Sequence, residues 1–480
     1  MNTDINIVGK IALVSIITTL AACGGESSSS VQAPAITSHV FAATNGSDGT
    51  ELYISDGTKD GTKMLKDIHA GYYDSNPEQF VNVSGNTFFV AQDYDHGIEL
   101  WKTDGTEAGT EMVKDIETGG SSSSLKMLTE FNNKLFFRAY RGTSDEQLWT
   151  SDGTEGGTEL FKGFALLEDL TVVGDTLFFS ANGRDGNGVE LWKSDGTVDG
   201  TVMVKDIYSS SSHPQSLTAV GDTLYFTAYA SGGRVLWKSD GTEAGTVPLT
   251  NSVSGPGEMG RFTAVEDKLF FTAFTTAENR ELWVSDGTEA GTKMVRNIAD
   301  EGMVARAVAQ ASGRSSLIEN MTAVGRELFF TADDGIHGLE LWKSDGSEAG
   351  TVLVKDINSQ DDDGSNPSSL IAFGDTLLFS AATDDSGNTH SIWSTDGTEA
   401  GTVSMLDTTG TGINNDFTSI GIEQYSNESL LFIDGTNVLM TANFGEGIQL
   451  LSTDGTAGGT KLITTINPSG DAFYFQDFQP

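Results

Sequence analysis

Short apolar segments recur along the chain from residue 39 onward, and each is bounded by Gly, Asp or Ser. One unit reads "SLTAVGDTLYFTA" (Ser216–Ala228), followed by "VLWKS" and "DGTEAGTVPL". These segments are rich in Phe, Leu, Val and Thr, which is typical of β-strands joined by tight turns. Each unit therefore predicts four short strands. The Trp segment is the third strand, and Asp-Gly-Thr begins the turn into the fourth.

Apolar positions within the predicted strands are nearly continuous, as in "LFF" at Leu177–Phe179, Leu269–Phe271 and Leu328–Phe330. Strands of this kind are buried on both faces, and in a propeller each blade is covered by two neighbours. The units lack the i, i+3, i+4 spacing that a helical solenoid requires. The pattern therefore predicts an all-β chain folded as a single β-propeller.

One signature repeats once per unit, as in "ELWKSDGSEAGT" (Glu340–Thr351). Its Asp recurs with spacings of 48, 48, 43, 45, 46, 59, 51 and 58, at Asp56, Asp104, Asp152, Asp195, Asp240, Asp286, Asp345, Asp396 and Asp454. Every tryptophan of the chain stands three residues before this Asp, at Trp101, Trp149, Trp192, Trp237, Trp283, Trp342 and Trp393. Self-similarity at this period is typical of propellers. Nine copies predict about nine four-stranded blades, with eight as the alternative.

The two ends of the repeat region predict how the ring closes. The first unit begins with "HVFAAT" (His39–Thr44), which matches a second strand and lacks a first. The tail "NPSGDAFYFQDF" (Asn467–Phe478) aligns with the start of another unit, "NPSSLIAF" (Asn366–Phe373). We expect the C-terminal strand to complete the first blade, because an open array would expose sheet edges.

The signature itself predicts structural roles. We expect the Trp to pack between blades and the Asp-Gly-Thr turn to be held by its own side chains, since Asp and Thr bond nearby backbone amides. Both glycines of the turn are expected to take positive φ. The turn resembles the Asp-box turn between the third and fourth strands of sialidase-type propeller blades, although the spacing differs. Metal binding by the nine Asp residues is the alternative to internal bonding.

These residues resemble the bacterial ELWxxDGT-repeat proteins, some of which carry hyalin-repeat labels. The resemblance covers about residues 39–467, and L-W-x-x-D-G is intact in copies two to seven. Copy one has "LYISDG", copy eight "IWSTDG" and copy nine "LLSTDG". A longer family consensus is seen in "FFTADDGIHGLELWKSDGSEAGTVLVKDI" (Phe329–Ile357). The resemblance implies a propeller-like surface protein without an assigned activity.

The first residues have the layout of a signal peptide. An apolar run, "IALVSIITTL" (Ile11–Leu20), follows Lys10 and ends at Ala21 and Ala22. The run is too short to span a bilayer as a helix. The tetrad "LAAC" (Leu20–Cys23) resembles a bacterial lipobox, which implies cleavage before the Cys and acylation of it. The alternative is an ordinary secreted protein, or a short anchor, with a chance Cys.

These features divide the chain into three parts. Residues 1–22 are the expected signal peptide, and residues 23–38 are the lipidated Cys23 with a Gly/Ser-rich flexible tether. Residues 39–480 are the expected propeller of nine DGTxxGT repeats. Cys23 is followed by two glycines and no Asp, which resembles the outer-membrane-sorted class. We therefore expect a bacterial cell-envelope protein, lipid-anchored at the outer membrane.

Charge narrows the choice of partners. Asp and Glu number 68 against 27 Lys and Arg, giving a formal net charge of -41. Such a surface repels nucleic-acid phosphates and anionic headgroups, so nucleic acid is excluded and membrane contact is expected through the lipid alone. Solubility is the alternative explanation of the charge. Cys23 is the single cysteine of the chain, which excludes intrachain disulfides. We expect the protein to be a monomer.

Strand order separates the ring into two ends. The 1–2 and 3–4 turns lie at one end and are uniform, whereas the 2–3 and 4–1 connections lie at the other and vary. Variable loops on a fixed scaffold commonly carry function. Two insertions enlarge this second end, Ala299–Arg314 and Thr408–Asn427. We expect a protein or polysaccharide to dock there; length variation in solvated loops is the alternative.

Calcium is the candidate cofactor. Ca²⁺ takes six to eight oxygen ligands, and "DDDGSN" (Asp361–Asn366) and "RDGNG" (Arg184–Gly188) are oxygen-rich. Asp361, Asp363 and Asp185 are the candidate ligands. Neither segment matches the EF-hand loop, which ends in a Glu that both lack.

No catalytic residue is assigned. The sequence has no G-x-S-x-G elbow and no H-E-x-x-H motif, and its arginines do not repeat with the unit. His96 and His337 occupy equivalent slots, so they are read as features of the repeat. The expected function is a non-enzymatic, lipid-anchored interaction scaffold. The alternatives are a calcium-dependent adhesin and a glycan-active enzyme on an Asp-box-like propeller.

Overall fold

The computed structural model describes residues 38–142, 146–250, 258–274, 280–298, 317–359, 364–382, 390–405, 430–434, 437–443, 448–456 and 459–467. Several expectations fall on residues outside these ranges. They are the signal peptide, Cys23 and the tether up to residue 37, the candidate ligands Asp361 and Asp363, and both insertions. The Asn467–Phe478 tail, apart from its first residue, also lies outside the described ranges.

The chain is all-β, and its strands fall into nine successive groups. The first three groups are β1 (His39–Thr44), β2 (Thr50–Ser55), β3 (Lys63–Lys66); β4 (Glu78–Val83), β5 (Asn86–Asp93), β6 (Gly97–Thr103), β7 (Glu111–Lys114); and β8 (Lys126–Phe131), β9 (Lys134–Ala139), β10 (Gln147–Ser151), β11 (Glu159–Gly163). The next three are β12 (Leu166–Val173), β13 (Thr176–Asn182), β14 (Val189–Ser194), β15 (Val202–Lys205); β16 (Gln215–Val220), β17 (Thr223–Ala230), β18 (Gly233–Ser239), β19 (Val247–Pro248); and β20 (Met259–Val265), β21 (Lys268–Phe274), β22 (Arg280–Ser285), β23 (Lys293–Arg296). The last three are β24 (Glu319–Val324), β25 (Glu327–Asp333), β26 (Leu339–Ser344), β27 (Val352–Lys355); β28 (Ser368–Phe373), β29 (Thr376–Ala382), β30 (His390–Thr395), β31 (Val403–Ser404); and β32 (Leu430–Asp434), β33 (Asn437–Asn443), β34 (Ile448–Thr453), β35 (Lys461–Asn467).

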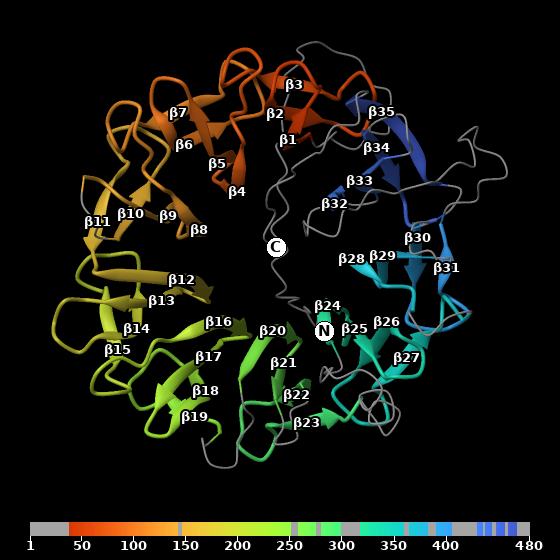
Figure 1. Ribbon diagram of the computed structural model, residues 1–480. Coiled ribbons are helices and arrows are strands. Elements are labelled where there is room, and N and C mark those ends of the chain that lie inside the picture. The colour runs from red at the N-terminus through yellow and green to blue at the C-terminus, as the bar shows by residue number, and fades with distance from the viewer. Residues whose placement is uncertain are drawn as a thin grey trace, which may run out of the picture.

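Each group is one antiparallel sheet in which strands adjacent in sequence are hydrogen-bonded neighbours. Figure 1 shows the nine sheets standing around a central axis, with the first strand of each four-stranded sheet nearest the centre. The protein is therefore a nine-bladed β-propeller, which confirms the main prediction and excludes the eight-bladed alternative. Among the described residues no helix is long and apolar enough to cross a membrane.

Blade one contains three described strands, β1, β2 and β3, whereas the other eight contain four. In blade one Phe41 pairs with Tyr53, as Phe89 pairs with Trp101 in blade two. The first described strand therefore occupies the second-strand position, as the sequence predicted. Blade one also packs against blade nine, because Phe41 and Tyr53 share a core cluster with Leu439 of β33 and Leu450 of β34. This contact joins the two ends of the ring.

The hydrophobic cores lie between blades. One cluster joins Phe88 and Leu100 of blade two to Leu135, Phe137 and Trp149 of blade three. Equivalent clusters join further neighbouring pairs, and in each of these the Trp comes from the following blade. In blades one to seven the second strand is thus covered on both faces, which explains the continuous apolar runs in the sequence.

The innermost strands carry a feature that the sequence did not predict. Register shifts interrupt the pairing of each first strand with the second. A residue in this region has positive φ, for example 55° at Gln79 and 51° at Asn320. The side chain then reaches the next blade: Gln79 Nε2 donates to Leu125 O at 3.2 Å, and Asn320 Nδ2 donates to Pro367 O at 3.3 Å. These bulges bond neighbouring blades near the central axis.

Candidate functional site

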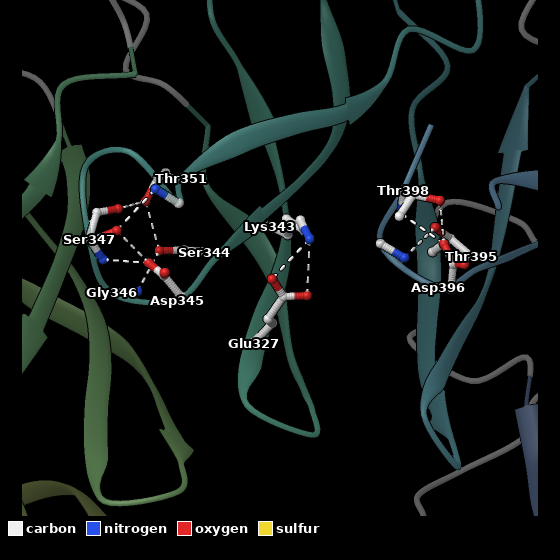
Figure 2. A network of polar contacts seen from close by, with 12 residues as sticks. Glu327, Lys343, Ser344, Asp345, Gly346, Ser347, Thr351, Thr395, Asp396 and Thr398 are labelled. Carbon is white, nitrogen blue, oxygen red and sulfur yellow. Dashed lines mark hydrogen bonds and ion pairs between the residues drawn. The ribbon is translucent and has the colours of Figure 1, made fainter. Parts of the chain in front are cut away.

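The Asp-Gly-Thr turns are closed by bonds within each turn (Figure 2). In blade seven Asp345 Oδ1 accepts the N–H of Ser347 at 2.8 Å and its hydroxyl at 2.7 Å. Ser347 Oγ accepts the N–H of Gly350 at 3.0 Å, and the hydroxyls of Ser344 and Thr351 are bonded at 2.7 Å. The same two bonds to the carboxylate occur at Asp56, Asp104, Asp152, Asp195, Asp240, Asp286, Asp396 and Asp454. The carboxylates serve to hold the turns.

The two glycines of the turn are required for different reasons. The first has positive φ in every copy, for example 88° at Gly346. The second does not: Gly350 is required because an ideal Cβ there would lie 2.2 Å from Asp345 Oδ1. The expectation that both glycines take positive φ is therefore wrong for the second. The space that its missing Cβ leaves is filled by the Asp carboxylate.

Basic residues join the turns of blades two to eight to the preceding blade. Lys102 Nζ donates to Gly153 O at 2.8 Å, and Lys114 Nζ donates to Thr158 O at 2.8 Å. The bond to the second Thr of the next turn recurs from Lys66, Lys162, Lys205, Arg296 and Lys355. Three of these cations also lie over the following Trp ring, at 5.2 to 5.8 Å from its centroid. The turn is therefore also an inter-blade joint.

The joint between blades seven and eight contains an ion pair (Figure 2). Lys343 Nζ lies 2.9 Å from Glu327 Oε1 and 3.1 Å from Oε2. A Cβ at Gly397, in the turn of blade eight, would lie 3.2 Å from this ammonium and 3.3 Å from the carboxylate. The uniform end of the ring is thus bonded both within each turn and between blades.

A buried glutamate, the Glu of Glu-Leu-Trp, holds the loop that leads to the next blade. Glu99 is 0% exposed. Its carboxylate accepts the N–H of Ile116 at 2.9 Å, the N–H of Glu117 at 3.3 Å and the hydroxyl of Ser123 at 2.9 Å. Corresponding bonds are made by Glu51, Glu190, Glu281 and Glu340. Each glutamate fixes the 4–1 connection against its own blade.

Burial changes the acidity of these glutamates. It raises the pKa of Glu51, Glu99 and Glu340 to about 7, although bonds from serine hydroxyls and backbone amides lower it. Burial also raises the pKa of Glu190. The sequence analysis did not single these residues out. The sequence did contain a signal for them, namely a carboxylate inside an apolar strand. Such a carboxylate must accept several hydrogen bonds when it is buried.

Blades three, five, eight and nine depart from this pattern, and in blades eight and nine the glutamate position is Ser391 and Gln449. In blade three Glu146 stands one position earlier, pairs with Arg138 Nη1 at 3.1 Å and accepts the hydroxyl of Tyr140 at 2.8 Å. In blade five Val235 takes the glutamate position, and the preceding Arg234 lies over the Tyr229 ring, 4.3 Å from its centroid. Glu146 Oε2 also accepts the N–H of Leu167, so in blade three a glutamate still fixes the connection to blade four, whereas blade five has no glutamate at this position.

The variable end, called the loop face below, comprises the 2–3 and 4–1 connections and the strand ends beside them. All the exposed tyrosines of the described residues lie there, with exposed fractions of 74% at Tyr72, 48% at Tyr73, 82% at Tyr94, 38% at Tyr208 and 43% at Tyr229. Aromatic side chains with a polar tip are common at protein interfaces. The loop face thus differs from the opposite end in both sequence and exposed chemistry.

The described residues contain no group of three or more His, Cys, Asp or Glu side chains arranged to hold a metal ion. Asp185 is exposed, and its Oδ1 accepts the N–H of Asn187 at 3.1 Å. His96 Nδ1 lies 2.8 Å from Asp93, and His337 Nδ1 lies 2.8 Å from Asp334; each carboxylate raises the pKa of its histidine. The two histidines make the same local contact, as expected of a repeat feature.

No known family model matches the chain, and no curated protein sequence does. Solved structures resemble it distantly. Puromycin hydrolase is 11% identical with a TM-score of 0.40; the match covers 81% of this chain but 53% of that one, so this chain spans about half its length. The β-propeller domain of the Trilobed protease from Pyrococcus furiosus is 9% identical, with coverage of 71% and 98% and a TM-score of 0.35. TolB from Acinetobacter baumannii is 12% identical, with coverage of 65% and 78% and a TM-score of 0.31.

Proposed function

We propose that the protein is a non-enzymatic interaction scaffold of the bacterial cell envelope that binds a protein or polysaccharide through its loop face. One observation carries the proposal: the Asp and Glu carboxylates of the repeat are bonded within the ring, and the sequence variation is concentrated in loops that the ring holds in place. The Asp carboxylates close turns and the buried Glu carboxylates fix loops. A rigid frame that presents unlike loops is suited to recognition.

The membrane part of the proposal rests on the sequence around Cys23. Acylation there would tether the propeller through the Gly/Ser-rich segment, and two or more acyl chains anchor stably where one is marginal. The net charge of -41 disfavours direct contact of the ring with anionic headgroups. The propeller is then held near the membrane with its loop face available to a partner.

The test compares the two ends of the ring by blocking each separately. In a Cys23→Ser chain, a polyethylene glycol group is attached to Ser209→Cys in the loop face or to Asp222→Cys in a 1–2 turn; both native residues are exposed. Binding is measured to a panel of purified envelope proteins and polysaccharides. Loss of binding only after modification at 209 supports the proposal. Equal binding by both conjugates, or turnover of any polysaccharide, contradicts it.

A further inference from the structure

The strongest unassigned surface is an acidic tyrosine patch on the loop face. It consists of Tyr72, Tyr73 and Tyr94 with the exposed carboxylates Asp67, Asp74 and Asp95. The rings of Tyr72 and Tyr73 lie 4.3 Å apart between centroids at an interplanar angle of 30°, and their hydroxyls are bonded at 2.9 Å. Tyr73 also stacks on His69, with centroids 5.0 Å apart at an interplanar angle of 19°. Exposed patches of large side chains rimmed by polar residues mark interaction sites, whereas single exposed side chains do not.

The loops that carry the patch are fixed before any partner arrives. Asp74 Oδ1 accepts the N–H of Thr50 at 2.7 Å, and Asp74 O accepts Gln92 Nε2 at 2.7 Å. The next residue, Ser75, accepts the N–H of Gln92 at 2.9 Å and is held by the buried Glu51. These bonds tie the Tyr72–Tyr73 loop to blades one and two. A partner would therefore lose little affinity to ordering these loops.

The segments that carry the patch are rich in carboxylates and contain no Lys or Arg. Between Lys66 and Lys102 the sequence has six carboxylates, of which Glu99 is buried and Glu78 lies 3.7 Å from Lys126, and Asp93 raises the pKa of His96. The two flanking lysines are already bonded to the next turns, Lys66 to Thr110 O at 2.5 Å and Lys102 to Gly153 O at 2.8 Å. No described Lys or Arg stacks on Tyr72, Tyr73 or Tyr94; the one ring partner from a basic residue is His69, on Tyr73. An anionic partner is disfavoured here and a cationic one attracted.

Elsewhere on the loop face, aromatic side chains are stacked against arginines of this chain. In blade five the guanidinium of Arg234 lies over Tyr229, 4.3 Å from the ring centroid. In blade six Arg280 lies over Phe274 at 4.5 Å. In both cases a cation stacks on an aromatic ring at the end of the second strand. The patch on blades one and two offers exposed aromatic rings on which no described Lys or Arg is stacked.

We propose that the acidic tyrosine patch binds a Lys- or Arg-bearing segment of a partner protein, by stacking its cations on the tyrosines and pairing them with the nearby carboxylates. This inference rests on the proposed loop-face function and names the partner chemistry. A neutral polysaccharide could also stack on the rings. The concentrated negative charge favours the cationic segment, because a neutral glycan gains nothing from it.

The test measures binding of fluorescent peptides to the full chain in neutral detergent. The probes are an Arg-Gly repeat, a citrulline-Gly repeat of the same length and a neutral dextran. The Arg peptide should bind, weaken as salt rises, and exceed the citrulline peptide. Tyr72→Leu with Tyr94→Leu should weaken its binding roughly 5- to 20-fold, since each exposed cation–π contact contributes on the order of a 2- to 5-fold effect. Tyr208→Leu, at another exposed loop-face tyrosine, is the matched control.

Two further double variants distinguish binding at the patch from a general attraction of the cationic peptide to an acidic protein. Asp67→Asn with Asp95→Asn removes two charges beside the patch, and Asp175→Asn with Asp222→Asn removes two exposed charges from the opposite end. The first pair should weaken the Arg peptide several-fold more than the second. Equal effects of the two pairs, or an unchanged affinity in the tyrosine variant, would overturn the inference. Tyrosine-dependent dextran binding without Arg-peptide binding would also overturn it. The proposed function would survive these results if the conjugate at residue 209 still blocked a partner.

Discussion

The adjacent glycines of the blade-three turn, "TEGGT", should respond in opposite directions to the same substitution. A Cβ on Gly157 would lie 2.1 Å from Asp152 Oδ1 and 2.3 Å from Oδ2, so the carboxylate cannot keep its position. A Cβ on Gly156 meets nothing within 4 Å, and neither glycine has positive φ. In five other copies the Gly156 slot is already Ala. Gly156→Ala is therefore the matched control for Gly157→Ala.

The magnitude follows from the bonds that Asp152 would lose. Its Oδ1 accepts the N–H of Thr154 at 2.9 Å and the hydroxyl at 2.7 Å. Bonds to a charged acceptor contribute roughly 1.5–3 kcal/mol each when buried and less in an exposed turn, so Gly157→Ala should cost about 2–3 kcal/mol. Gly156→Ala should be neutral or stabilise by about 0.4–1 kcal/mol, since it restricts the unfolded chain at an unstrained position.

Thermal unfolding monitored by calorimetry gives the change in melting temperature of each variant. Hydrogen exchange of residues 146–163 shows whether the loss of stability is confined to blade three. Gly157→Ala should lower the melting temperature and deprotect this turn, whereas Gly156→Ala should do neither. Equal melting temperatures for the two variants would refute the argument that the Asp carboxylate occupies the missing Cβ's space. Loss of protection in distant blades alone would refute its local character.

Three further outcomes are expected. Burial raises the pKa of Glu99 to about 7 from 4.5. The stability that the protonated Glu99 contributes is then fully present below pH 4.5 and is lost as pH rises through 7. Glu99→Gln should therefore reduce the fall in melting temperature between pH 5 and pH 8. An unchanged pH profile would mean that the three donors keep this carboxylate ionised. Removal of residues 468–480 should destabilise blade one before the others, because the sequence predicts that this tail supplies the innermost strand of that blade. Hydrogen exchange of residues 39–66 would show the effect, and uniform destabilisation of all blades would contradict the prediction. Cys23→Ser should move the protein from the membrane fraction to the soluble fraction and abolish labelling by a fatty acid, whereas Ser27→Ala in the tether should change neither.

Local signals in the sequence predicted the strand order within a blade, the number of blades and the bonding of the turns. They did so because each depends on residues within one unit, such as Asp345 with Ser347. The conformation of the second glycine of the turn was predicted wrongly, because its role depends on a contact and not on its φ. A turn residue is usually glycine because of its φ, and only the coordinates place the Asp345 carboxylate where the Cβ of Gly350 would be.

The buried glutamates were missed although they stand in the repeat signature. Glu99 bonds to Ile116 and Ser123, which lie 17 and 24 residues further on, and such partners cannot be read from a twelve-residue motif. The clue was a carboxylate in an otherwise apolar strand. The inter-blade bond of Lys114 to Thr158 spans 44 residues, and in the same way depends on how one unit is placed on the next.

By itself the sequence determined an all-β ring of repeated blades, because strand periodicity and turn chemistry are local and recur in each copy. The tertiary structure alone decided which turn each lysine bonds, which loop each glutamate holds, and that Tyr72, Tyr73 and Tyr94 stand exposed on one end of the ring. Those features are contacts or exposures created when blades pack together, and a surface is defined only once the rest of the chain has been buried.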